Sequence, residues 1–152
     1  LKGNRDMYLV SSNNKGETFG LGERLGIQHW SLNACPMDGG MLAIAPNGEV
    51  VTAWRRGNTV FTSIGKAKSD TMLENGEQPW IASNPSGTYV VWLTKRDGRV
   101  RLAKLGTPNS TTIAENARDP IVAVGDGNES PVFVFWEQRA GDRVSIECQL
   151  VH

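Results

Sequence analysis

A strand that ends in tryptophan recurs three times in the 152-residue chain, and this repeat constrains the fold more than any other feature. The strands cover residues 49–54, 88–92 and 132–136, and their final tryptophans are 38 and 44 residues apart. A turn rich in Gly, Pro and Asn precedes each strand, and a charged turn follows it. A period of about 40 residues is typical of repeat proteins built from one supersecondary unit.

Each unit consists of strand-like segments joined by tight turns. Short apolar runs precede the first turns, and further strands begin at Val60, Val100 and Val144 after the charged turns. The 17 Gly and 7 Pro supply turn conformations, while Val, Phe, Tyr and Trp favour half-buried strands. A single small sheet cannot bury both of its faces, so its neighbours must cover it. The pattern therefore predicts an all-β fold of antiparallel meander repeats, stacked radially as a β-propeller.

A turn motif precedes the first tryptophan strand. From Ser12 the chain reads Ser-x-Asn-x-Gly-x-Thr-Phe, which is similar to the Asp box of bacterial neuraminidase repeats, with Asn14 where that family usually has Asp. In such a turn the Asx side chain accepts backbone N–H bonds, the glycine takes a positive φ, and the aromatic residue anchors the turn in the sheet. We expect a structural role for the box residues Ser12, Asn14, Gly16, Thr18 and Phe19.

The box, together with residues 5–8 and 34–40, resembles the C-terminal part of sialidase-like six-bladed propeller proteins. The resemblance implies about three blades, half of a six-bladed ring, with the box opposite the ligand-binding face. The expected units are a half blade at 1–28, blades at 39–76 and 77–116, and a three-stranded incomplete blade at 117–152. This register predicts thirteen strands and corresponds to the C-terminal half of a longer propeller.

A half ring exposes the faces of its terminal blades, which favours association. We therefore expect a homo-oligomer, a dimer that completes the propeller. Sixteen basic and sixteen acidic side chains balance in charge, so neither nucleic acid nor a membrane surface is an expected partner. No apolar run is long enough to span a bilayer. We expect a cytoplasmic protein, or a secreted or periplasmic one if a leader has been removed.

Charged side chains gather at the turns after the tryptophan strands and at the connections between units. In a propeller these segments lie on one face, and arginines there bind carboxylate-bearing or hydroxylated ligands such as carbohydrates. Solvated hairpin tips are the alternative interpretation. The candidate ligand-binding residues are Arg5, Asp6, Asp38, Arg55, Arg56, Arg96, Arg118, Asp119 and Glu137.

The resemblance implies an arginine triad, an Asp acid/base and a Tyr nucleophile activated by a Glu. Tyr8 and Tyr89 are the only tyrosines, and neither fits that role, so the catalytic residues remain unassigned. The leading hypothesis is a noncatalytic scaffold or glycan-binding module that acts after self-association. Two alternatives stay open: part of an exo-sialidase-like glycosidase whose other catalytic residues lie in an N-terminal half, and a protein–protein interaction platform.

Two tryptophans outside the repeat, Trp30 and Trp80, are either buried between blades or platforms for sugar stacking. Cys35 and Cys148 favour buried or paired thiols, and a reactive Cys35 in its loop is the alternative. With only two cysteines and two histidines, no zinc pattern is present, and we expect neither a metal nor a cofactor.

Overall fold

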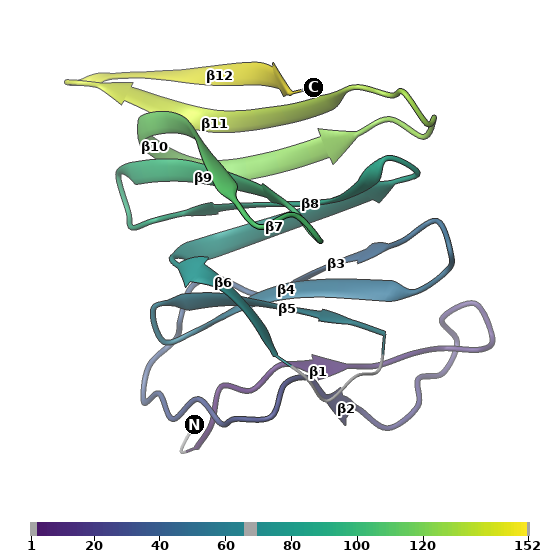
Figure 1. Cartoon of the computed structure of the whole chain (residues 1–152). Helices are drawn as coiled ribbons and strands as arrows, with labels where there is room; N and C mark the ends of the chain where they lie inside the picture. Colours follow the sequence, from purple (N-terminus) through teal and green to yellow (C-terminus); the bar gives the residue numbers. More distant parts are fainter. Residues whose placement is uncertain (1–2, 66–69, 152) are drawn as a thin grey trace.

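The computed structural model describes residues 3–65 and 70–151, and the chain in these ranges folds as antiparallel strands (Figure 1). The predicted all-β class is therefore confirmed. No helix in the described part of the chain is long and apolar enough to cross a membrane. The strands are β1 (Tyr8–Leu9), β2 (Glu23–Arg24), β3 (Met41–Ile44), β4 (Val50–Arg56), β5 (Thr59–Ile64), β6 (Thr71–Asn75), β7 (Glu77–Asn84), β8 (Gly87–Leu93), β9 (Gly98–Lys104), β10 (Ser110–Val124), β11 (Val132–Ala140) and β12 (Arg143–Val151).

The strands form three sheets, and each larger sheet follows chain order. β1 pairs with β2, β3 to β6 form a four-stranded sheet, and β7 to β12 form a six-stranded sheet. The six-stranded sheet curls because β10 changes partner along its length. Residues 110–117 of β10 pair with β9, whereas residues from 117 to 124 pair with β11, with a register shift between Arg118 and Ile121. The two strands expected on either side of the 116/117 boundary are thus one bent strand, which leaves twelve strands in the described residues instead of thirteen.

The first strands of successive units lie side by side. β3 packs against β7, and β7 packs against β10. Within each unit the tryptophan strand pairs with the first strand: β4 with β3, β8 with β7, and β11 with the C-terminal part of β10. The repeat in the sequence therefore corresponds to a recurring arrangement of paired strands in the structure.

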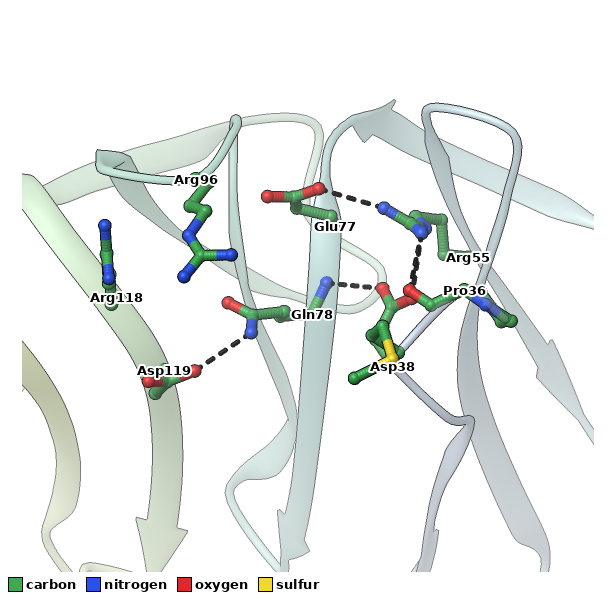
Figure 2. Close-up of a pocket in the computed structure, with 9 residues that line it drawn as sticks. Pro36, Asp38, Arg55, Glu77, Gln78, Arg96, Arg118 and Asp119 are labelled. Carbon is green, nitrogen blue, oxygen red and sulfur yellow. Dashed lines mark hydrogen bonds and ion pairs between the residues drawn. The ribbon is translucent and has the colours of Figure 1, made fainter. Parts of the chain in front are cut away.

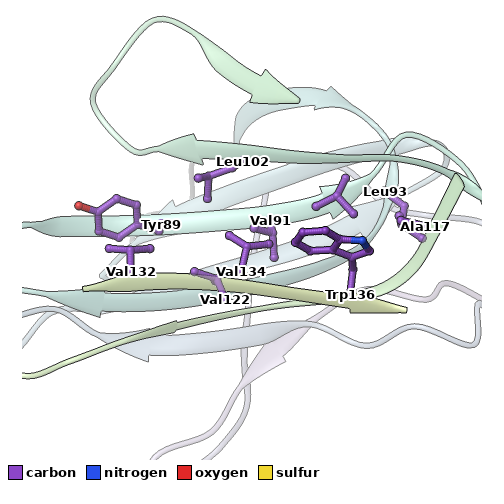
Figure 3. Packing of buried hydrophobic residues seen from close by; sticks show 10 residues of the cluster. Tyr89, Val91, Leu93, Leu102, Ala117, Val122, Val132, Val134 and Trp136 are labelled. Atoms are coloured by element: carbon purple, nitrogen blue, oxygen red, sulfur yellow. The ribbon is translucent and has the colours of Figure 1, made fainter. Parts of the chain in front are cut away.

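The core lies between units, and β8 contributes to both halves of it. Tyr89, Val91 and Leu93 point to one side, where they pack with residues of β9, β10 and β11 that include Trp136 (Figure 3). Val90 and Trp92 point to the other side, against β4, β5 and β7. Because successive side chains of a strand alternate between faces, a run of apolar residues in β8 buries both faces and joins the two clusters.

Turns of the two kinds lie at opposite ends of the strands (Figure 1). The β4–β5, β8–β9 and β11–β12 turns are on the left of the view. The β3–β4, β7–β8 and β10–β11 turns are on the right, together with the loop between β1 and β2 that carries the Asp box. This is the arrangement expected from the sequence.

The Asp box forms the predicted turn. The Asn14 Oδ1 atom accepts hydrogen bonds from the Thr18 backbone N–H at 3.0 Å and from the Ser12 hydroxyl at 2.8 Å. Gly16 has a φ of 90° and donates its N–H to the Ser12 Oγ atom at 2.8 Å. The Asn14 amide thus forms the turn in which the resemblance implies a carboxylate.

The expected anchor role of Phe19 is wrong, because its side chain is 61% exposed. The strands that flank the box, β1 and β2, have two residues each. They form too small a surface to cover an aromatic ring.

The expectation of buried or paired cysteines is also wrong, since Cys35 and Cys148 are free and exposed. Cys35 lies in the irregular segment before β3, and Cys148 lies on β12, whose residues 143–150 are all exposed. Nothing in the described chain packs on that side of β12, so its cysteine stays in solvent.

Candidate functional site

A pocket of about 450 Å³ opens where three units begin, at the end of the molecule that carries the charged turns (Figure 2). Three segments at matching places supply most of it: the loop before β3, the first residues of β7 and the bend in β10. Two arginines complete it, one from β4 and one from the β8–β9 turn. The lining residues are Pro36, Met37, Asp38, Arg55, Glu77, Gln78, Arg96, Arg118 and Asp119.

Arg55 is the centre of one wall. Its guanidinium Nη2 lies 3.0 Å from the Asp38 Oδ1 atom, and its Nη1 donates to the Glu77 Oε2 atom at 2.9 Å. Nη2 also donates to the Pro36 carbonyl at 3.0 Å, and the guanidinium carbon lies 5.5 Å from the centre of the Trp30 ring. The side chains of Arg55 and Asp38 are only 14% and 7% exposed. This arginine is therefore held by the protein and serves as a positioning group rather than a free cation.

The floor of the pocket is built from two residues with left-handed backbone. Gln78 has a φ of 51° and Asp119 a φ of 47°, and the register of β7 and β10 shifts at these points. Such irregularities re-aim side chains. The Gln78 amide Nε2 donates to the Asp119 Oδ1 atom at 2.9 Å, and the Gln78 backbone N–H donates to the Asp38 Oδ2 atom at 2.9 Å. These bonds link all three units.

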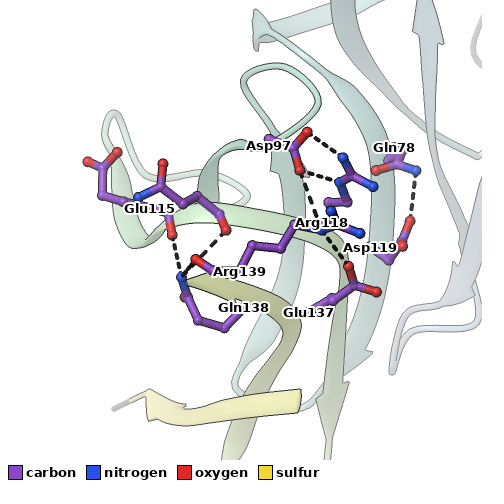
Figure 4. A network of polar contacts seen from close by, with 9 residues as sticks. Gln78, Asp97, Glu115, Arg118, Asp119, Glu137, Gln138 and Arg139 are labelled. Atoms are coloured by element: carbon purple, nitrogen blue, oxygen red, sulfur yellow. Dashed lines mark hydrogen bonds and ion pairs between the residues drawn. The ribbon is translucent and has the colours of Figure 1, made fainter. Parts of the chain in front are cut away.

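The opposite wall carries Arg118, which donates through both Nε and Nη2 to the carboxylate of Asp97 (Figure 4). The hydrogen bonds from Arg118 are the main reason that the pKa of Asp97 lies below its usual value, and the same contact raises the pKa of Arg118. Arg139 extends the network, with its Nε 3.0 Å from Glu137 Oε1 and 3.8 Å from Asp97 Oδ1. Both partners of the Arg118 pair are thus charged at neutral pH.

Arg96 differs from the other two arginines of the pocket. It is exposed, and Figure 2 shows its guanidinium in the space between Arg118 and Glu77. Among the described residues it makes no hydrogen bond and no ion pair within 4 Å; its charge acts on Asp97 only at longer range. Arg96 is therefore the cation of this pocket that remains available to a ligand.

Five of the nine candidates read from the sequence meet in this pocket: Asp38, Arg55, Arg96, Arg118 and Asp119. Glu137 lies in the adjoining network but does not line the pocket. Arg56 points elsewhere: it pairs with Asp70 and lies 4.0 Å from the centre of the Phe61 ring. Arg5 and Asp6 belong to a separate contact region before β1, where the Arg5 Nε donates to the Ala34 carbonyl at 3.0 Å.

Asp6 holds the loop that follows β2. Its carboxylate accepts the Trp30 backbone N–H at 2.9 Å and lies 2.5 Å from His29 Nδ1 and 3.7 Å from Arg24 Nη1. Burial alone would raise the pKa of Asp6, but the Trp30 and His29 hydrogen bonds and the nearby positive charges outweigh it, so the pKa is lowered.

This lowered pKa predicts an acid-sensitive contribution to stability. A carboxyl whose folded pKa lies below its unfolded value, near 3.9, stabilises the protein fully above that value and loses the effect as pH falls through the folded pKa. We expect Asp6→Asn to lower Tm by on the order of 4 °C at pH 7. The difference should shrink as pH falls below about 4. Thermal denaturation at several pH values checks this, with the exposed Asp126→Asn as control; a pH-independent difference contradicts it.

Sequence reasoning placed Glu77 and Gln78 among polar connections but not among the candidates. A usable signal was present in the dipeptides Gln78-Pro79 and Asp119-Pro120, which are 41 residues apart; the first lies at the start of β7 and the second at the bend within β10. Their recurrence marks equivalent positions, and equivalent positions of stacked units lie close together in space.

A second, more apolar pocket of about 220 Å³ continues from the first and shares Met37, Asp38, Gln78 and Asp119 with it. Trp80, Pro120 and Ile121 are among the residues that line the second pocket. Trp80 is half-buried: it packs against the core cluster and also lines this pocket, while the role as a platform for sugar stacking stays a prediction.

Comparison of the sequence with models of protein families and with curated proteins finds no match. In the described residues, no group of three or more His, Cys, Asp and Glu side chains is arranged to hold a metal ion.

Proposed function

We propose that this chain is a noncatalytic, sialidase-like half-propeller that binds acidic carbohydrates in the Arg96 pocket. The observation that carries the proposal is the position of Arg96, an unpaired guanidinium in a pocket of about 450 Å³ whose other walls are rich in hydrogen-bonding groups.

The repeated geometry supports the propeller part of the proposal. First strands of successive units pack side by side, tryptophan strands follow them, and turns of one kind gather at one end. A radial array of small antiparallel sheets has these properties. The Asp-box turn lies at the other end, as it does in the resemblance described above.

The chemistry of the pocket supports an acidic sugar. A guanidinium binds a carboxylate through a bidentate fork, which Arg96 can supply. Sugar hydroxyls are both donors and acceptors, and the Asp119 and Glu77 carboxylates and the Gln78 amide offer matching partners. Trp80 in the adjoining pocket gives an apolar surface for the face of a sugar ring.

The arrangement favours binding over hydrolysis. Tyr89 packs in the core between units, and Tyr8 on β1 lines a different, small cavity. Neither tyrosine lines the Arg96 pocket, where a sialidase-like nucleophile would need to be.

The binding test compares three probes: free N-acetylneuraminic acid, a hexuronic acid and a neutral hexose, titrated into the full chain and followed by NMR. We expect the acids to bind and the neutral sugar to bind far more weakly. Arg96→Ala should weaken binding of the acids by about 10- to 100-fold, because a charge-assisted contact is lost. Arg99→Ala is the matched control, since Arg99 is exposed, pairs with Glu115 and lies outside the pocket. Equal binding by wild type and Arg96→Ala would contradict the assignment.

An assay for turnover of a fluorogenic sialoside tests the alternative that the protein is an enzyme. Turnover that is lost in Arg118→Ala or Arg5→Ala would refute the noncatalytic function. Binding to a protein partner without any sugar binding would instead favour an interaction platform.

A further inference from the structure

Each unit has two faces that contact different neighbours. On the tryptophan strands, the residues one and three positions before the tryptophan point towards the following unit, and we call these positions forward-facing. They are Val51 and Ala53 on β4, and Tyr89 and Val91 on β8, and all four are buried. They pack in the two core clusters against the unit that follows.

In the last unit no segment of the described residues covers the same positions. Phe133 and Phe135 on β11 are only half-buried, with ring centres 6.1 Å apart. Their strand neighbours continue the surface, since Leu150 and Cys148 of β12 lie directly opposite them. Ile146 on the same face is 75% exposed. The apolar part of the forward face thus comprises Ile121, Phe133, Phe135, Val144, Ile146, Cys148 and Leu150, and the Glu137–Arg139 pair lies on the same face opposite Ile146 and Val144.

At the other end of the chain the opposite surface is uncovered over β3, although Thr52 and Trp54 on the same side of β4 are buried. Leu42 on β3, Ile81 on β7 and Val122 on β10 occupy equivalent positions, because each lies opposite the residue two places before a tryptophan. Ile81 and Val122 are buried by the preceding unit at 4% and 2% exposure, whereas Leu42 is 54% exposed. Ile44 on the same side of β3 is also exposed, and Tyr8 adjoins Leu42 across a small cavity. Tyr8, Leu42 and Ile44 form the backward face.

We propose that a second copy of this chain covers the forward face with its own backward face. Inside the chain, forward positions pack on backward positions twice, once at each core cluster, and the contact between copies continues that interface. The free faces are apolar surfaces of the kind that marks interaction sites. The contact is heterologous, because two different surfaces meet. In a dimer that closes a ring, this contact occurs twice. Each copy contributes its forward face to one contact and its backward face to the other.

Sedimentation velocity over a dilution series of the full chain tests the proposal. Wild type should associate reversibly. Ile146→Glu on the forward face and Leu42→Glu on the backward face should each raise the dissociation constant by on the order of 100-fold, since each removes apolar burial and brings an unpaired carboxylate into the contact. Gln149→Glu is the matched control, because it adds the same charge to the other face of β12.

Mixing the two variants distinguishes a contact between a forward face and a backward face from a contact between two identical faces. Ile146→Glu retains an intact backward face and Leu42→Glu an intact forward face, so the mixture should associate while neither variant does alone. Recovery on mixing also shows that both variants are folded. A wild type that stays monomeric at every concentration overturns the proposal. So does a Leu42→Glu variant that associates like wild type while Ile146→Glu does not, because the forward face would then pair with itself.

Discussion

Trp92→Ala should lower the free energy of unfolding by about 3–5 kcal/mol, the cost of emptying a fully buried aromatic site. Trp92 has no exposed surface and packs in the cluster that joins β4, β5 and β7 to β8. The free energy of unfolding of a small domain is about 5–15 kcal/mol in total. The variant should therefore unfold at a much lower urea concentration than wild type. Urea denaturation with an unchanged m value is the measurement. Met72→Ala, at a 65% exposed site, should change stability by less than about 0.5 kcal/mol.

Trp92→Phe provides a sharper control, because the indole Nε1 of Trp92 is buried and has no hydrogen-bond partner within residues 3–65 and 70–151. Phenylalanine removes that unpaired donor, which partly offsets the lost ring volume. Trp136 is different: its Nε1 donates to the Gln138 Oε1 atom at 2.9 Å. We therefore expect Trp92→Phe to cost less than Trp136→Phe, although Trp92 is the more deeply buried residue. The opposite order would show that ring packing alone sets the cost.

The repeat and its turns could be read from the sequence because each depends on local chemistry. Trp54, Trp92 and Trp136 end strands at one repeat position, and the turns between them require residues that close hairpins. The Asp-box turn needed only side chains within a few residues of Asn14. Phe19 failed as an anchor because burial depends on distant neighbours, which local pattern does not specify.

The site was harder to predict because it depends on register. Asp38, Arg55 and Glu77 come from three separate segments, and they meet only after units stack. A charged residue at a turn is expected to be exposed, but its charge does not show in which direction the side chain points. Arg55 and Arg56 are adjacent in sequence, yet they pair with different residues. The bend of β10 that brings Asp119 to the pocket follows from a bulge, which the alternation of apolar residues along the strand does not specify.

Arg55→Met should destabilise the protein by about 3 kcal/mol, because it leaves two carboxylates without their cation. Asp38 is almost wholly buried and Glu77 largely so. The cost therefore comes less from the lost attraction than from the unpaired charges left behind. If so, neutralising the carboxylates in the same background, as Arg55→Met with Asp38→Asn and Glu77→Gln, should recover most of the stability.

Wild type, Arg55→Met, the Asp38→Asn/Glu77→Gln double variant and the triple variant form a cycle whose interaction energy measures the coupling between the guanidinium and the two carboxylates. Chemical denaturation at neutral pH supplies each value, and Arg99→Met with its exposed partner Glu115 is the matched control, expected to cost less than about 1 kcal/mol. A triple variant no more stable than Arg55→Met alone would contradict the charge account, since the guanidinium would then act through packing on Trp30 and the Pro36 carbonyl instead. Recovery, by contrast, would mean that Arg55 stabilises the fold mainly by compensating the charges of Asp38 and Glu77 in the wall of the pocket.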